Sequence, residues 1–181
     1  MWLSRNRILD TRVLHQLMGD SNKVSLVKTL LNESNGVLRS YHLGDAPSQD
    51  IVTAHAWLVE QVIKAIWEHH APSPEKGRSV ALIAVGGYGR SELHPGSDID
   101  LLVLFQKAPT KTQRRNTESL IQTLWDIGLT IGHSVRTLRD CTSQSRNDVT
   151  VMTNLLESRV LAGDAELLSQ LKLRTGIDMM W

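Results

Sequence analysis

The stretch Val80–Phe105, VALIAVGGYGRSELHPGSDIDLLVLF, decides the fold of this chain. It opens with an apolar run, breaks at Gly86-Gly87, turns at His94-Pro95-Gly96 and becomes apolar again from Ile99. This order predicts a strand, a glycine turn, a short helix, a second turn and a second strand.

Two carboxylates stand at the start of the second predicted strand. Side chains alternate between the faces of a strand, so Asp98 and Asp100 share one face while Ile99 points to the other. Their Cα atoms are expected roughly 6.6 Å apart, which lets the carboxylate oxygens converge on neighbouring ions. Carboxylate oxygens are hard ligands, so the spacing predicts a site for Mg²⁺ or Mn²⁺.

The glycine pair predicts a phosphate site within fifteen residues of those acids. Because Gly86 and Gly87 have no Cβ, the backbone can adopt unusual dihedral angles and a phosphate can approach the amide groups. Arg90 and Ser91 follow closely enough for one or both to reach phosphate oxygens.

Each of these features also has an ordinary structural interpretation. A Gly-Gly after a strand is often only a tight turn, and the run from Gly87 resembles a dinucleotide fingerprint until Glu92 replaces its last glycine. Asp98 could cap the turn, and Asp100 could face solvent on an edge strand. One shared site accounts for all of these features together, so we favour it.

The string GGYGRSELHPGSDIDLL resembles the signature of the DNA polymerase β-type nucleotidyltransferase superfamily. It is similar, more narrowly, to the N-terminal domain of the bifunctional uridylyltransferase/uridylyl-removing family. That resemblance implies UTP as donor and a tyrosine hydroxyl of the nitrogen-signalling protein PII as acceptor. The expected reaction is a two-metal transfer of UMP in which Asp98 and Asp100 hold Mg²⁺ or Mn²⁺. It covers residues 80–163 strongly, because GLTIGHSVRT at 128–137 and DVTVMTNLLESRVLAG at 148–163 look like later blocks of the family.

The third predicted strand, residues 129–137, departs from the superfamily pattern. Nucleotidyltransferases of this type usually add a third carboxylate there, whereas this chain has His133, Ser134 and Arg136. Arg136 could pair with phosphate, with Asp100, or with a purely structural partner. His94 could contact substrate or make a structural hydrogen bond. Asp126, Asp148 and Glu157 are remote in the sequence, and we do not predict any of them as the missing acid.

The composition is that of an ordinary globular protein. The chain has 181 residues, a net charge of +1, one cysteine and no apolar run long enough for a membrane span. A charge so near zero gives no field that would attract nucleic acid, and a lone Cys141 cannot form an internal disulfide. We therefore expect a cytoplasmic protein that binds neither nucleic acid nor membrane.

Hydrophobic periodicity predicts an α/β (α+β) fold in which helices flank a small mixed sheet. An N-terminal helical region, residues 1–75, is expected to pack on a nucleotidyltransferase core and its following helices, residues 76–181. The side chains of three tryptophans are expected to pack in the hydrophobic core: Trp57, Trp67 and Trp125. Helices are predicted at 3–18, 22–32, 49–69, 110–127, 148–162 and 165–171, a loop at 40–48, a turn or short helix at 138–146, and a connector at 71–77.

The chain ends on apolar Met179, Met180 and Trp181, which predicts a fragment of a longer multidomain protein. No His-Asp dipeptide occurs, so the family's uridylyl-removing hydrolase domain is expected to be missing, as are its glutamine-sensing domains. Two other functions stay open: a catalytically inert nucleotide-binding regulatory domain, and a helical protein-interaction module.

Overall fold

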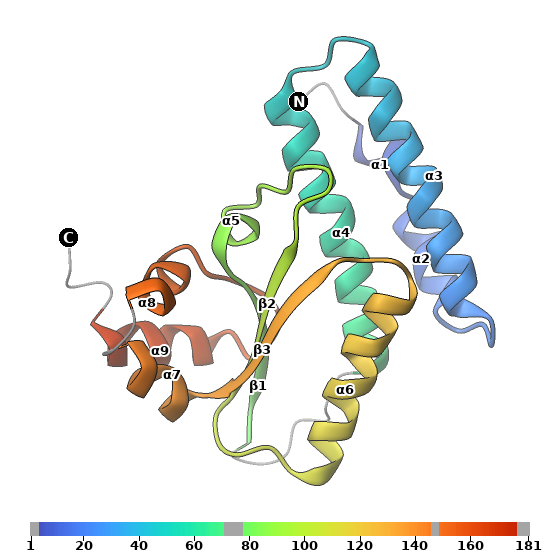
Figure 1. Cartoon of the computed structure of the whole chain (residues 1–181). Helices are drawn as coiled ribbons and strands as arrows, with labels where there is room; N and C mark the ends of the chain where they lie inside the picture. Colours follow the sequence, from blue (N-terminus) through green and yellow to red (C-terminus); the bar gives the residue numbers. More distant parts are fainter. Residues whose placement is uncertain (1–3, 71–77, 146–148, 177–181) are drawn as a thin grey trace. The chain divides into compact units, whose positions relative to one another are not determined.

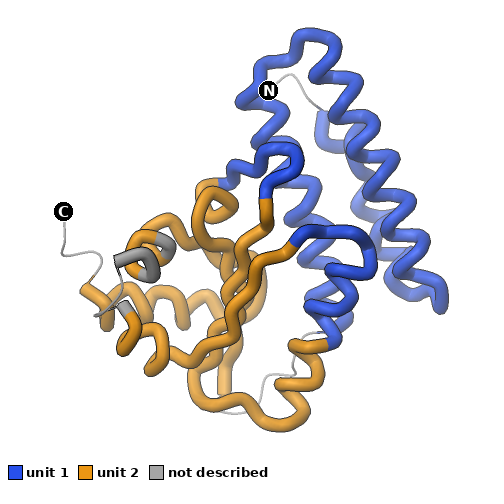
Figure 2. The backbone as a smooth tube through the Cα atoms, viewed as in Figure 1, with its two compact units in different colours: residues 1–71, 91–97, 119–130 blue, residues 72–90, 98–118, 131–181 orange. Residues whose placement is uncertain are grey.

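A computed structural model describes residues 4–70, 78–145 and 149–176. The predicted connector at 71–77 and the apolar terminus at 179–181 lie outside the described residues. The chain divides into two compact units, one comprising residues 1–71, 91–97 and 119–130 and the other residues 72–90, 98–118 and 131–181 (Figure 2). The chain therefore passes between the units several times. We call the first the helical unit and the second the sheet unit.

The sheet unit is built on four strands in the order β3-β2-β1-β4. Strand β1 pairs antiparallel with both β2 and β4, while β2 pairs parallel with β3, so the predicted mixed sheet is confirmed. The strands are β1 (Val80–Ala84), β2 (Ile99–Phe105), β3 (Ile131–Thr137) and β4 (Arg159–Gly163).

One face of this sheet carries the core of the unit. Alternation along the two central strands puts Ala81 and Ile83 of β1 and Leu102 and Leu104 of β2 on that face, and all four are buried. They pack in one cluster with apolar residues of the C-terminal helices, which gather beside the sheet in Figure 1. These helices are α7 (Leu138–Ser145), α8 (Val149–Leu156) and α9 (Glu166–Thr175).

The fourth strand corrects a prediction from the sequence. The helix predicted over 148–162 is wrong, because α8 ends at Leu156 and residues 159–163 form β4. Ser158 closes the helix by donating its amide to the Leu155 carbonyl, and Arg159 then lies opposite Ala84 of β1. The helical spacing of apolar residues continued across this boundary, but pairing with β1 decided the conformation.

The helical unit contains four helices of the chain's N-terminal part, and two predictions there are also wrong. The single helix predicted at 3–18 is two helices, because the Asp10 side chain accepts a hydrogen bond from the Arg12 amide and starts a new one. The helix predicted at 22–32 continues through Gly36 and reduces the predicted loop at 40–48 to a short connection. The observed helices are α1 (Arg5–Ile8), α2 (Thr11–Leu17), α3 (Lys23–Leu43) and α4 (Ser48–His70).

The tryptophans only partly follow the predicted core. Trp67 is buried and Trp57 half-buried, but Trp125 is 46% exposed near the end of α6 (Lys111–Asp126). Its neighbour Leu124 is fully buried, so the apolar face of α6 is narrower than the sequence pattern indicated. Across the described residues, no helix combines the length and apolar character that crossing a bilayer requires.

Candidate functional site

The glycine turn follows β1 directly and lies beside the start of β2. Gly86 opens the one-turn helix α5 (Gly86–Gly89) with φ +59°, a left-handed conformation that favours glycine. The preceding residue, Val85, donates its amide to the Asp100 carbonyl at 3.1 Å. This bond holds the turn and the acidic end of β2 at the same end of the sheet.

The two acids lie as the alternation predicts. Asp98 and Asp100 are exposed, while Ile99 between them is 3% exposed. Partial burial raises the pKa of Asp100, and the nearby Asp98 charge raises it further. The charge of Asp98 therefore makes the ionised form of Asp100 less favourable, and a cation between the two carboxylates would relieve their repulsion.

Strand β3 makes room for the Asp100 carboxylate at Gly132. Gly132 is the direct partner of Asp100 in the parallel ladder. A Cβ on Gly132 would lie 2.6 Å from the Asp100 Oδ1 atom, closer than side chains approach one another. The carboxylate therefore occupies volume that any other residue at this position would fill. Gly132 was not predicted as a site residue from the sequence, because only the pairing of β2 with β3 brings it beside Asp100.

The remainder of α5 is anchored to the residues that lead into β4. A Cβ on Gly89 would lie 1.9 Å from the Glu157 carbonyl oxygen, so only glycine fits there. Tyr88 is 2% exposed, and the Arg159 guanidinium lies 5.9 Å from the centre of its ring. Glu157 and Arg159, which lie between α8 and β4 and at the start of β4, thus pack against the residues of the glycine turn.

Glu157 also contacts a residue that was predicted to bind phosphate. Its carboxylate forms an ion pair with the Arg90 guanidinium at 2.5 Å, and the two side chains are 35% and 48% exposed. Glu157 is remote from the acid pair in the sequence and was not predicted as a site residue. Only knowledge of β4, which brings residue 157 back to α5, could have linked two residues so far apart in sequence.

Ser91 adopts φ +62°, which is uncommon for a residue with a side chain. Such a conformation costs on the order of 1–3 kcal/mol and persists only where the surrounding structure enforces it. Strained residues of this kind cluster at binding sites and turns. The conformation supports a specific role for the segment that begins at Ser91.

Arg136 lies away from the acid pair. It stands opposite Leu104 in the ladder, four residues beyond Gly132, which corresponds to about 13 Å along the strand. The predicted pairing of Arg136 with Asp100 is therefore wrong. Hydrogen bonds from Thr137 lower the pKa of Asp140, with smaller contributions from Arg139 and Arg136, so Arg136 belongs to the far end of the sheet.

The described residues place no third acid with the pair in a group that could hold a metal ion. Among the residues with described positions, no group of three or more His, Cys, Asp or Glu side chains could hold a metal ion. Asp126 belongs to the helical unit, Asp148 lies outside the described residues, and Glu157 pairs with Arg90. Two exposed, mutually repelling carboxylates nevertheless fit a divalent cation that takes its remaining oxygens from a substrate and water.

The sequence left the roles of His94 and His133 open, and the two residues belong to different units. His133 is exposed on β3 opposite Leu101. His94 belongs to the helical unit, where it lines a cavity with residues of α3 and α4.

Comparison with known proteins gives consistent results. Residues 71–144 match the family model described as "Nucleotidyltransferase domain". The chain is similar to bifunctional uridylyltransferase/uridylyl-removing enzymes, with 38% identity to that of Ectopseudomonas mendocina (strain ymp) and 36% to that of Stutzerimonas stutzeri (strain A1501), each over 89% of this chain and 18% of the relative. The enzyme of Azotobacter vinelandii is 44% identical over 72% of this chain and 14% of its own length. The chain thus spans less than a fifth of the length of these relatives.

Proposed function

We propose that this chain, whose residues 71–144 match the family model described as a nucleotidyltransferase domain, transfers UMP from UTP to a tyrosine hydroxyl of the PII signalling protein. The names of the similar enzymes support a uridylyl donor. The observation that carries the proposal is the hydrogen bond from Val85 to Asp100, which joins the glycine turn to the acid pair. We place the uridylyl-removing activity in those names, as part of the same proposal, in the parts of the relatives that this chain does not match.

Asp98 and Asp100 are the proposed metal ligands. Mg²⁺ or Mn²⁺ held there would act as a Lewis acid on the phosphate oxygens and offset the charge of the leaving pyrophosphate. The raised pKa of Asp100 supports this role, because its carboxylate gains more from a bound cation than an isolated one would. Gly132 keeps the space beside Asp100 clear of side chains.

The glycine turn is the proposed triphosphate site. Gly86 and Gly87 let the phosphates approach the backbone amides, and Arg90, in the same unit, would steady the β- and γ-phosphate oxygens. Glu157 orients the Arg90 guanidinium before substrate arrives. Arg136 was also predicted as a phosphate ligand, but its distance from Gly132 along β3 gives that role no support.

The proposed reaction is one in-line displacement. The tyrosine oxygen forms a bond to the α-phosphorus of UTP, the bond from that phosphorus to the bridging oxygen breaks, and pyrophosphate leaves. The hydroxyl proton passes to solvent. The products are uridylylated protein and pyrophosphate.

A second candidate is a nucleotide-binding domain without catalytic activity, which is consistent with the described residues holding no third acid in a metal-binding group with the pair. Such a domain would bind UTP with a divalent cation and leave it intact. Turnover separates the two candidates, because only a transferase releases pyrophosphate when PII is present.

A panel of nucleoside triphosphates with Mg²⁺ and PII tests the proposal. We expect UTP to give labelled PII, and Asp100→Asn to reduce the rate at least about 100-fold, since it removes a metal ligand. Asp126→Asn is the matched control, because Asp126 is exposed on α6, where it accepts a hydrogen bond from the Gln122 side chain. Equal rates for Asp100→Asn and the wild type would contradict the proposal.

A further inference from the structure

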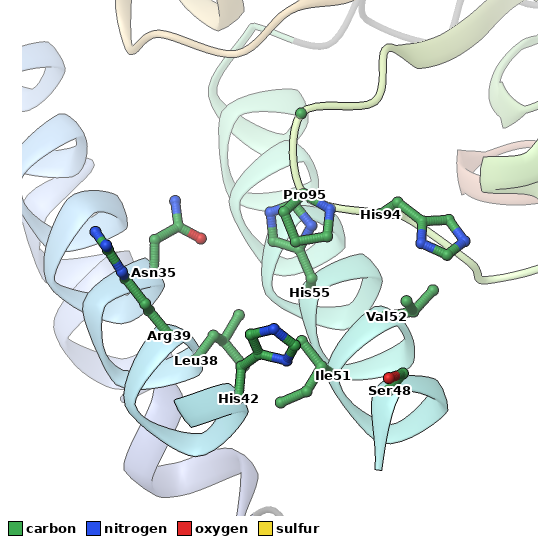
Figure 3. Close-up of a pocket in the computed structure, with 11 residues that line it drawn as sticks. Asn35, Leu38, Arg39, His42, Ser48, Ile51, Val52, His55, His94 and Pro95 are labelled. Carbon is green, nitrogen blue, oxygen red and sulfur yellow. The ribbon is translucent and has the colours of Figure 1, made fainter. Parts of the chain in front are cut away.

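The helical unit contains a cavity that the transfer reaction does not use. Its volume is about 600 Å³, within the roughly 300–1,000 Å³ typical of small-molecule sites. Three segments form its walls: the C-terminal half of α3, the first turns of α4 and the turn His94-Pro95-Gly96 (Figure 3). All of them belong to the helical unit.

The inner wall of this cavity is apolar. Leu38 of α3 and Ile51 and Val52 of α4 are each no more than 5% exposed, and Pro95 faces them from the turn. These side chains are part of the packed core, so the wall does not depend on a ligand to form. A ligand with an apolar body would bury its surface against them.

The polar part of the lining is basic or neutral. Arg39 and His42 come from α3, His55 from α4 and His94 from the turn. None of the lining residues within the described part of the chain is acidic. Arg39 is charged at any physiological pH, so the lining favours an anion over a cation.

The turn is held in place by a hydrogen bond from α4. His55 donates its Nδ1 proton to the Leu93 carbonyl at 3.0 Å, because a carbonyl oxygen can only accept. Burial lowers the pKa of His55, which keeps the ring in the neutral form that makes this single donation. The wall formed by His94 and Pro95 is therefore fixed before any ligand binds.

Three imidazoles in one cavity could also indicate a metal site. The described residues contain no group of three His, Cys, Asp or Glu side chains placed to hold a metal ion, so these histidines do not converge on one point. They are spread around the wall instead, as hydrogen-bonding groups for an organic molecule.

We propose that this cavity binds a small organic carboxylate, whose apolar or aromatic body packs on Leu38, Ile51 and Val52 and whose carboxylate pairs with Arg39. Arginine suits this role because its planar guanidinium binds a carboxylate through two parallel hydrogen bonds. The proposal does not rest on UTP or PII.

Fluorine NMR with two matched probes tests the proposal on the intact chain. The probes are 4-fluorobenzoate and the neutral 4-fluorobenzamide, which share an aromatic body and differ in charge. We expect the benzoate to bind the wild type at least about tenfold more tightly than the benzamide, because a charged hydrogen-bonded pair is lost in the neutral probe.

Two variants and one control locate the binding. Arg39→Gln should weaken the benzoate about tenfold and leave the benzamide unchanged, while Arg39→Lys, which keeps the charge, should retain part of the preference. Arg115→Gln changes an equally exposed helical arginine outside the cavity and should have no effect. Equal binding of the two probes, or benzoate binding that survives Arg39→Gln, would overturn the proposal.

Discussion

Asp98 and Asp100 are the residues on which the proposed chemistry depends, and their like charges oppose each other on β2. Partial burial and the neighbouring Asp98 raise the pKa of Asp100, so the ionised pair costs free energy in the absence of a cation. Residues that reduce stability in this way are common in functional sites. The acid pair is better explained by binding a cation than by stabilising the fold.

The pH dependence of stability tests that explanation at Asp100. Because its pKa is raised in the folded state, Asp100 contributes stability below its ordinary value of 3.8, and this contribution is lost as the pH rises through the folded value. Asp100→Asn cannot ionise, so we expect it to melt at a higher temperature than the wild type near pH 7 without added metal. The difference should narrow as the pH falls toward 3.8, the ordinary pKa of the group.

Thermal melts of the two proteins across this pH range measure the effect. A variant less stable than the wild type at neutral pH would show that Asp100 has a structural role instead.

Glu157 was not predicted as a site residue, but the structure places it beside Arg90. It forms an ion pair with Arg90, and exposed pairs of this kind contribute at most about 1 kcal/mol to stability. We expect Glu157→Gln to leave the melting temperature almost unchanged and to raise the KM for UTP about threefold to tenfold, because Arg90 loses its orientation.

Steady-state kinetics with UTP as the varied substrate measure this change, and Glu157→Asp should restore part of the affinity. A lower KM in Glu157→Gln would mean that Glu157 competes with phosphate for Arg90 and does not position it.

At the scale of elements, the sequence correctly predicted those helices and strands whose conformation is determined by neighbouring residues in the chain. The order of apolar run, glycine pair, turn and acidic strand from Val80 to Phe105 was confirmed as β1, α5 and β2. β4 was mistaken for the end of a helix, because Val160 and Leu161 continue helical spacing and only pairing with β1 makes them a strand. The helix predicted at 22–32 continues through Gly36 to Leu43, because neighbouring helical residues outweigh one glycine.

The same limit applies to the site. The acids and the glycine pair are close in sequence and were found from it, whereas Gly132 and Glu157 reach the site through β3 and β4. Strand pairing between distant segments has no signature in a single sequence.

Alanine substitutions at three glycines test how these elements meet. Gly89→Ala should lower stability by about 3 kcal/mol or more, because the new Cβ would collide with the Glu157 backbone carbonyl. Gly132→Ala should keep the fold, because its Cβ meets only the mobile end of Asp100, but should reduce transfer by about tenfold or more.

Gly36→Ala is the control, since a Cβ there meets nothing within 4 Å and alanine favours a helix by about 0.5–1 kcal/mol. Urea unfolding and transfer rates measure the series. A stable, fully active Gly132→Ala would contradict the assigned role of Asp100.

At the scale of the whole molecule, one buried thiol reports on the core of the sheet unit. Cys141 packs among the side chains between the sheet and the C-terminal helices, and burial raises the pKa of its thiol to about 11. Its ordinary value is 9.0, so the thiol contributes stability below that pH, and this contribution is lost as the pH rises toward about 11.

We therefore expect the wild type to lose stability relative to Cys141→Ala as the pH rises above about 9. The native thiol should react with an alkylating reagent only at the rate at which the sheet unit opens. Alkylation measured with and without urea tests this, and rapid labelling under native conditions would mean that the core is not closed.

The most direct test of the central claim is to follow two radioactive labels from UTP in the presence of Mg²⁺ and PII. If the acid pair and the glycine turn together hold a triphosphate for attack at its α-phosphorus, label at the α-position should become bound to PII and label at the γ-position should appear only in pyrophosphate. Asp98→Asn and Asp100→Asn should abolish both signals, and Asp126→Asn should preserve them. Label from the γ-position on PII, or unchanged transfer by both acid variants, would contradict the account.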